Sequence, residues 1–194
     1  MGFDLYGLNP ENPNKAVKPE QIDWSKKPTE KEKSAYFDAV DDFQIEVVGS
    51  YFRANVWYWR PIWSFVCGAC NDILTENDME RGSFNDGHKI SKTKAKRMAA
   101  RLRKLDKSGI IQTWEDEMMV HINKARKHNE EIDLDLSIFM AEMKMNYGDD
   151  IVPAKLSKKH KAKWQEIYDK KKWDAHYPAS REYIIEFSVF CDAS

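Results

Sequence analysis

A run of aromatic and apolar residues from Tyr51 to Phe65 constrains the fold of this chain more than any other stretch. It reads YFRANVWYWRPIWSF and holds three of the seven tryptophans. Rings of this size carry much of the packing energy of a protein core, so much of the run must pack against other elements. Pro61 divides the run, because the residue before a proline is pushed away from the helical region. We therefore predict extended or irregular backbone up to Arg60 and a helix that begins at Pro61.

Capping signals and hydrophobic spacing predict the other elements. Thr29 and Glu32 form a capping box at the start of a helix that ends near Gly49. Further helices are predicted over 91–108, over 113–127 and from Ser157, and residues 180–191 fit a helix better than a strand, which stays the alternative. A short strand is predicted over 3–6 and a polar loop over 76–87, whereas the pattern of residues 133–145 fits either a helix or a strand.

These elements indicate a mainly α fold of α+β type, with several packed helices and a small N-terminal β element. The length of 194 residues suits a single domain over residues 1–194. Four prolines make residues 9–28 an extended surface connection. A C-terminal helical extension over residues 150–194 stays open as an alternative for the end of the chain.

Charge and composition exclude several classes of protein. Lysine and arginine number 31 against 32 acidic residues, so the overall charge provides no general footprint for nucleic acid. No apolar run is long enough to span a membrane, and the opening MGFDLYG lacks the features of a secretory signal. The three cysteines fit reduced thiols in a cytoplasmic protein.

Two motifs together resemble a family of small, uncharacterised proteins of tailed bacteriophages and prophages. The matching positions are Gly2, Asp4, Tyr6 and Gly7, then Tyr51 to Trp63, then the turn from Asn85 to His88. Ala54 and Tyr58 depart from the family pattern, which has asparagine and tryptophan there. The resemblance implies a viral accessory protein in the cytoplasm of an infected bacterial host, with counter-defence as a natural use.

The aromatic run also mixes indole rings with guanidinium and amide groups, a combination that suits a planar, anionic ligand. We predict a ligand-binding site, with a host protein as the other class of partner, lined by Arg53, Asn55, Trp57, Trp59, Arg60 and Trp63, with Asn85, Asp86 and His88 at its edge. The alternative is structural: the tryptophans belong to the core, the arginines form salt bridges, and residues 85–88 are a turn that leads into a helix.

Two further functions stay open as alternatives. The basic helix over 91–107 predicts a nucleic-acid contact through Lys92, Lys96, Arg97, Arg101, Arg103 and Lys104, with a second basic helix over 157–172. An uncharacterised enzyme would use Asp86 and His88, although no third group of a triad is visible.

No cofactor motif occurs in the sequence, and we assign no catalytic residues and expect no cofactor. Cys67 and Cys70 form a lone Cys-x-x-Cys pair without two further ligands at a suitable spacing, so we expect no metal site. The oligomeric state is left open by the sequence.

Overall fold

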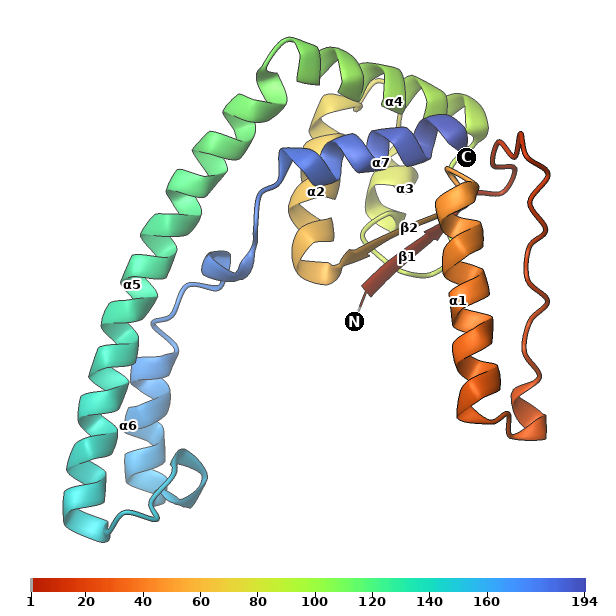
Figure 1. Cartoon of the computed structure of the whole chain (residues 1–194). Coiled ribbons are helices and arrows are strands. Elements are labelled where there is room, and N and C mark those ends of the chain that lie inside the picture. Colours follow the sequence, from red (N-terminus) through yellow and green to blue (C-terminus); the bar gives the residue numbers. More distant parts are fainter. Residues whose placement is uncertain (1) are drawn as a thin grey trace. The chain divides into compact units, whose positions relative to one another are not determined.

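The computed structural model describes residues 2–194; Met1 and the side chain of His176 lie outside this description. Within these residues the chain forms seven α-helices and one two-stranded antiparallel sheet, which confirms the mainly α fold with a small β element. The elements are β1 (Gly2–Tyr6), α1 (Glu30–Glu46), β2 (Tyr51–Asn55), α2 (Val56–Ala69), α3 (Glu76–Arg81), α4 (Lys92–Lys107), α5 (Ile110–Tyr147), α6 (Lys158–Tyr168) and α7 (Arg181–Ala193) (Figure 1).

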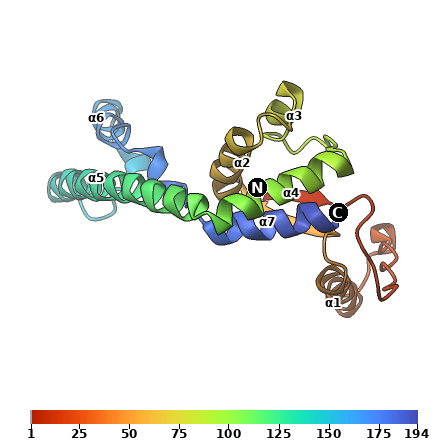
Figure 2. The ribbon, with the colours of Figure 1, turned by 90° about the horizontal axis from the view of Figure 1, so that it is seen from above.

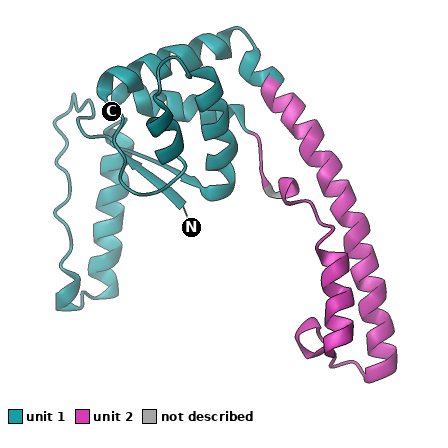
Figure 3. Ribbon diagram, turned by 180° about the vertical axis from the view of Figure 1, so that it is seen from behind, with its two compact units in different colours: residues 1–113, 180–194 teal, residues 114–179 magenta. Residues whose placement is uncertain are grey.

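Contacts within the chain divide it into two compact units (Figure 3). Unit 1 comprises residues 1–113 and 180–194, and unit 2 comprises residues 114–179. Residues 150–194 are thus shared between the units, since α6 belongs to unit 2 and α7 to unit 1.

The sheet of unit 1 is antiparallel, with Phe3 opposite Ala54 and Leu5 opposite Phe52. These inward-facing residues reflect the alternation of a half-buried strand, since Phe3, Phe52 and Ala54 are all buried. The opposite face of the sheet carries Asp4, Tyr6, Tyr51 and Arg53, and the ring centroids of Tyr6 and Tyr51 lie 5.3 Å apart there.

The core of unit 1 lies beneath this sheet, where α2 meets α4 and α7. α7 packs along α4, as the views from the side and from above agree (Figures 1 and 2). Helical spacing on α2 places four large side chains on one buried face: Trp59, Ile62, Trp63 and Val66. Met98 and Leu102 of α4 and Ile184 and Phe187 of α7 complete this core.

The predicted extended backbone up to Arg60 is wrong beyond Asn55. α2 begins at Val56, because the side chain of Asn55 accepts hydrogen bonds from the backbone N–H groups of Trp57 and Tyr58, both at 3.0 Å. Pro61 therefore lies inside the helix rather than at its start. Burial of one face of the helix outweighs the local preference of the residue before a proline.

Two other sequence predictions need correction. Residues 76–87 are not a loop throughout, because Thr75 and Asp78 form a capping box that starts α3. The predicted helix over 113–127 and the ambiguous segment 133–145 belong to one continuous helix, α5. By contrast, the helix starts at Thr29, Ser91 and Ser157 are confirmed, and residues 181–193 are a helix capped by Ser180.

Unit 2 is built from the part of α5 after Thr113 and from α6, which lie side by side (Figure 1). Phe139, Met143 and Leu156 form its buried cluster, with Trp164 packed against it. The segment after α6 is joined to α5 by Asn129. The side chain of Asn129 donates to the carbonyl of Lys172 and accepts from the Lys172 N–H.

α1 has no buried residue along its length. Residues 9–28 run alongside it as irregular chain with one 3-10 turn at Trp24–Lys26, and the Trp24 ring lies 6.2 Å from that of Phe37 (Figures 1 and 2). Of the helices between residues 2 and 194, none combines the length and the apolar character that crossing a membrane requires.

Candidate functional site

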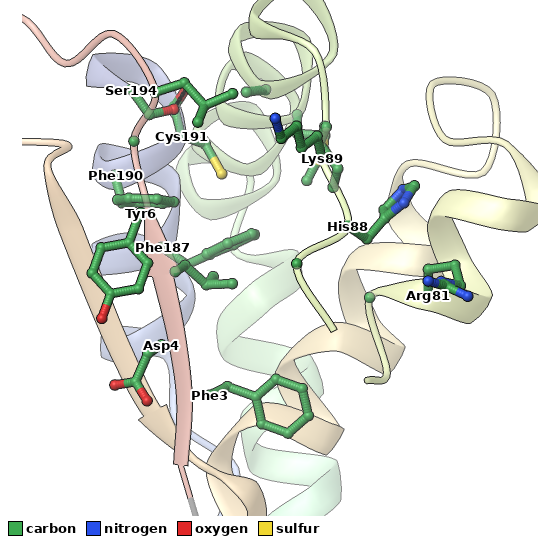
Figure 4. A pocket seen from close by; sticks show the side chains of 18 of the residues that line it. Phe3, Asp4, Tyr6, Arg81, His88, Lys89, Phe187, Phe190, Cys191 and Ser194 are labelled. Carbon is green, nitrogen blue, oxygen red and sulfur yellow. Dashed lines mark hydrogen bonds between the residues drawn. The ribbon is translucent and has the colours of Figure 1, made fainter. Parts of the chain in front are cut away.

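Unit 1 contains a cavity of about 530 Å³ between β1 and the segment that joins α3 to α4. This volume lies within the range of small-molecule and peptide-anchor sites. Residues 3–9 line one side and residues 84–85 and 87–92 line the other, and Phe3 and Phe187 point into the space between them (Figure 4). The cavity thus brings together the N-terminal strand, the middle of the chain and the last helix.

Aromatic and apolar side chains form the cavity floor, which we define as Trp59, Trp63, Met98 and Phe187. The Trp59 ring stacks on Trp63 with centroids 5.4 Å apart, and its indole N–H donates to the Gly82 carbonyl at 2.8 Å. The Trp63 indole N–H donates to the Met79 carbonyl at 2.9 Å. Both rings are therefore fixed, with only 2% of Trp59 and 3% of Trp63 exposed.

Lysines stand on the side of the cavity formed by the segment that joins α3 to α4 and by the start of α4. Lys89 and Lys92 are exposed there, and neither forms a salt bridge within residues 2–194. We call this pair the lysine rim. The aspartate among the lining residues, Asp4, points away from the cavity (Figure 4) and accepts a hydrogen bond from the Tyr51 hydroxyl at 2.5 Å. Arg53 lies 3.6 Å from the same carboxylate, so the negative charge of Asp4 is offset by Arg53 outside the cavity.

Asp78 organises the loop that carries the lysine rim. This carboxylate is only 5% exposed. It accepts hydrogen bonds from Lys94, from Thr75 and from the His88 ring at 2.9 Å. Burial alone would raise the pKa of Asp78, but these hydrogen bonds outweigh burial and hold the pKa well below its ordinary value. A single buried charge thereby joins α3, residue 88 and α4.

His88 and Asp86, the pair considered for an enzyme, do not act on each other through their side chains. The Asp86 carboxylate accepts from the backbone N–H of His88 at 3.1 Å and forms an ion pair with Arg81 at 2.8 Å. The His88 ring instead faces Asp78. Both groups therefore hold the turn in place, which is the structural alternative recognised from the sequence.

The predicted ligand residues separate into two groups. Trp59, Trp63, Asn85 and His88 line the cavity, with the two indoles as part of its floor. The others lie outside the lining: Arg53 on the outer face of the sheet, Asn55 at the cap of α2, Trp57 and Arg60 on the exposed side of α2, and Asp86 in its pair with Arg81. Of these, Trp57 is 38% exposed.

Half of the cations of α4 are paired with carboxylates of unit 1: Lys94, Lys96, Arg101 and Arg103. Arg101 donates to both oxygens of Asp72, at 3.1 and 2.9 Å, and Arg103 does the same with Asp192, at 2.8 and 3.3 Å. Lys96 lies 3.5 Å from Glu11, and Lys92 donates to the Asn9 carbonyl. Arg97 and Lys104 are exposed on the same helix. These pairs reduce the positive field available to a phosphate backbone.

Burial raises the pKa of both the Cys67 and the Cys70 thiol to about 11, so both are protonated at neutral pH. Across the described part of the chain, no three histidine, cysteine or acidic side chains gather in a way that would hold a metal ion.

Sequence reasoning missed the residues that turn the tryptophan run into a cavity. Met98 and Phe187 were recognisable as core positions from helical spacing, and Phe3 from its strand. Asp78 had a local signal in its capping box with Thr75. Nothing local indicates that residues 3–9 and 187–194 meet at one site.

Comparisons of the chain with protein-family models, with curated proteins and with solved structures found no match.

Proposed function

We propose that this chain acts by binding, and that the cavity of unit 1 is its site. The ligand has an apolar body, which packs against the accessible apolar side chains above the buried floor, Leu5, Leu8, Phe84 and Ile90, and an anionic group, which meets the lysine rim. The observation that carries this proposal is the cavity of about 530 Å³ with apolar walls and, on one side, two lysines that form no salt bridge within residues 2–194. Convergent polar groups on a largely apolar concavity are the usual form of a ligand site.

Preorganisation supports the same proposal. Two indole N–H groups are held by backbone carbonyls of α3 and the following turn, and the loop with the lysine rim is tied down through Asp78. A site that is already ordered loses less conformational entropy when a ligand binds.

The biological setting is also a proposal. The motifs shared with small phage proteins favour an accessory protein that sequesters a nucleotide-like anion or engages a host factor, with counter-defence as its use. No side chains arranged for turnover support the enzyme alternative, because His88 and Asp86 are occupied in fixing the turn.

A fluorescent anion tests the proposed site directly. We expect 8-anilinonaphthalene-1-sulfonate, an aromatic molecule with one sulfonate, to bind the folded protein with one-to-one stoichiometry in a calorimetric titration. Changing Lys89→Gln and Lys92→Gln together should raise the Kd by roughly fivefold or more, as expected for the loss of two partly exposed charge contacts.

The matched control is Lys104→Gln, an exposed lysine on α4 that does not line the cavity. It should leave the Kd unchanged, and all variants should keep the cooperative thermal unfolding of the parent protein. Absence of binding to the parent protein would remove the proposed site, and equal affinity of the double variant would remove the role of the lysine rim.

A further inference from the structure

The hydrogen-bonding pattern of the sheet leaves one edge of β1 open. Gly7 N–H donates to the Ser50 carbonyl at 3.1 Å, in line with the register that pairs Leu5 with Phe52. In an antiparallel pair, hydrogen-bonded residues alternate along each strand. Phe3, Leu5 and Gly7 therefore bond to β2, and the N–H and C=O groups of Asp4 and Tyr6 point to the other side.

These outward groups have no partner in the protein. Within residues 2–194, no hydrogen bond uses the backbone N–H or C=O of Asp4 or Tyr6. The outward carbonyl of Gly2 confirms the direction of this edge, because it accepts a hydrogen bond from the Asn85 side chain across the cavity at 3.3 Å. The open edge of β1 thus borders the cavity, and such an edge is a template for another strand.

The opposite wall, residues 87–91, has no regular secondary structure. Residues that flank this wall are hydrogen-bonded to the N-terminal segment: Asn85 donates to the Gly2 carbonyl, and Lys92 donates to the carbonyl of Asn9, beyond β1, at 3.4 Å. Both bonds are long and lie among exposed side chains, so an incoming chain displaces them easily. We call the part of the cavity between this wall and β1 the slot; the five residues of β1 span roughly 17 Å.

The side chains around the slot fit a strand of alternating character. One face of an added strand would continue the inward face of Phe3 and Leu5 and pack against the accessible apolar side chains of the lining, Leu8, Phe84 and Ile90. The lysine rim stands beside the slot with its charges unpaired, while the carboxylate of Asp4 is already offset by Arg53. Charge complementarity therefore favours acidic residues in the partner.

We propose that an extended, acidic segment of another polypeptide enters the cavity and adds as a third strand to the free edge of β1. This inference rests on the proposed function, because it names the class of ligand for the same cavity. Main-chain hydrogen bonds to Asp4 and Tyr6 contribute affinity. Apolar side chains of the partner pack against the cavity lining, and its acidic side chains meet the lysine rim, which disfavours neutral or basic partners.

The experiment uses a labelled heptapeptide of alternating valine and glutamate, blocked at both ends. We expect it to bind the full chain and to lose roughly tenfold or more in affinity when its glutamates are replaced by lysine. Two further versions carry N-methyl groups on the valines or on the glutamates. At least one of them should bind roughly fivefold or more weakly, because a strand uses alternate N–H groups for one edge.

Amide hydrogen exchange reports the pairing from the protein side. In the complex, exchange at Asp4 and Tyr6 should slow by roughly tenfold or more, whereas exchange at Leu5, which already bonds to β2, should change little. Unchanged exchange at Asp4 and Tyr6 in a saturated complex would overturn strand addition, and so would N-methylated peptides that both bind as tightly as the unmodified peptide.

A pair of variants isolates one backbone donor. Tyr6→Ala removes an exposed ring and keeps the outward N–H, while Tyr6→Pro removes the N–H as well at an edge position that tolerates proline. Tyr6→Pro should bind the valine–glutamate peptide roughly fivefold more weakly than Tyr6→Ala. Equal affinity of the two folded variants would contradict the proposal, and if Tyr6→Pro does not fold, the exchange measurement on the parent protein decides.

Failure of this inference is distinguishable from failure of the proposed function. If the sulfonate probe binds in the cavity and the peptide does not, the cavity remains a ligand site and strand addition is overturned. If neither probe binds, the proposed function falls and the inference falls with it.

Discussion

At the scale of single residues, Asp78 is the charge on which the geometry of the site depends. Its carboxylate meets Lys94 of α4, the His88 ring and the capping Thr75, which together fix the loop between α3 and α4. Hydrogen bonds to a buried charge contribute more to stability than those between neutral groups. Asp78 is therefore expected to stabilise the fold and the lysine rim together.

We expect Asp78→Asn to lower the free energy of unfolding by about 2–3 kcal/mol at pH 7, because the charge that Lys94 and His88 contact is lost. Because the folded-state pKa of Asp78 is depressed, its contribution is fully present above the unfolded-state pKa of about 4 and is lost as the pH falls below it. The gap between parent and variant in urea unfolding should thus shrink between pH 4 and pH 2.

Asp42→Asn is the control, since Asp42 is an exposed carboxylate on α1. It should leave the free energy of unfolding nearly unchanged across the same pH range. A gap for Asp78→Asn that stays constant from pH 7 to pH 2 would show that the ionised carboxylate is not the source of the stabilisation.

At the scale of elements, α2 and the α3 turn fit together through a glycine. A Cβ at Gly82 would collide with the indole of Trp63, so only glycine fits at this position of the turn. The turn in return supplies the carbonyl that accepts from the Trp59 indole. The floor of the cavity thus depends on a close approach that no spacing in the sequence indicates.

Gly82→Ala should therefore destabilise unit 1 by about 1–3 kcal/mol, the usual cost of forcing extra volume into a packed region. Gly68→Ala offers the matched comparison, because its added methyl group meets nothing and Gly68 lies inside α2. It should stabilise the protein by about 0.5–1 kcal/mol through the higher helix propensity of alanine. Equal effects of the two changes in thermal unfolding would contradict the packing described for Trp63.

The starts of the helices show which parts of the structure can be predicted from the sequence. The helix starts at Thr29, Ser91 and Ser157 follow from local caps, and these were found. The start of α2 was missed because Pro61 was given more weight than the Asn55 cap and the buried face of the helix. The preference of the residue before a proline against helical backbone is worth a few tenths to a few kcal/mol, and the burial of two tryptophans outweighs it.

At the scale of the whole molecule, the candidate site is formed by segments far apart in the chain. Four of the predicted ligand residues line the cavity, and two of these, Trp59 and Trp63, do so from the inside, as its floor. Arg53 and Arg60 lie on outer surfaces because one alternates to the solvent side of β2 and the other to the solvent side of α2. Periodicity identifies buried faces, yet it does not tell which buried faces leave space between them.

The central claim is that ligand binding occurs in the cavity between β1 and residues 84–92, rather than on the outer surface of Arg53, Trp57 and Arg60. The most direct measurement is a map of backbone amide chemical shifts in ¹⁵N-labelled protein titrated with 8-anilinonaphthalene-1-sulfonate. The account predicts that the largest changes lie in residues 3–9 and 87–92. Changes centred on Arg53, Trp57 and Arg60, with residues 3–9 and 87–92 unaffected, would contradict it.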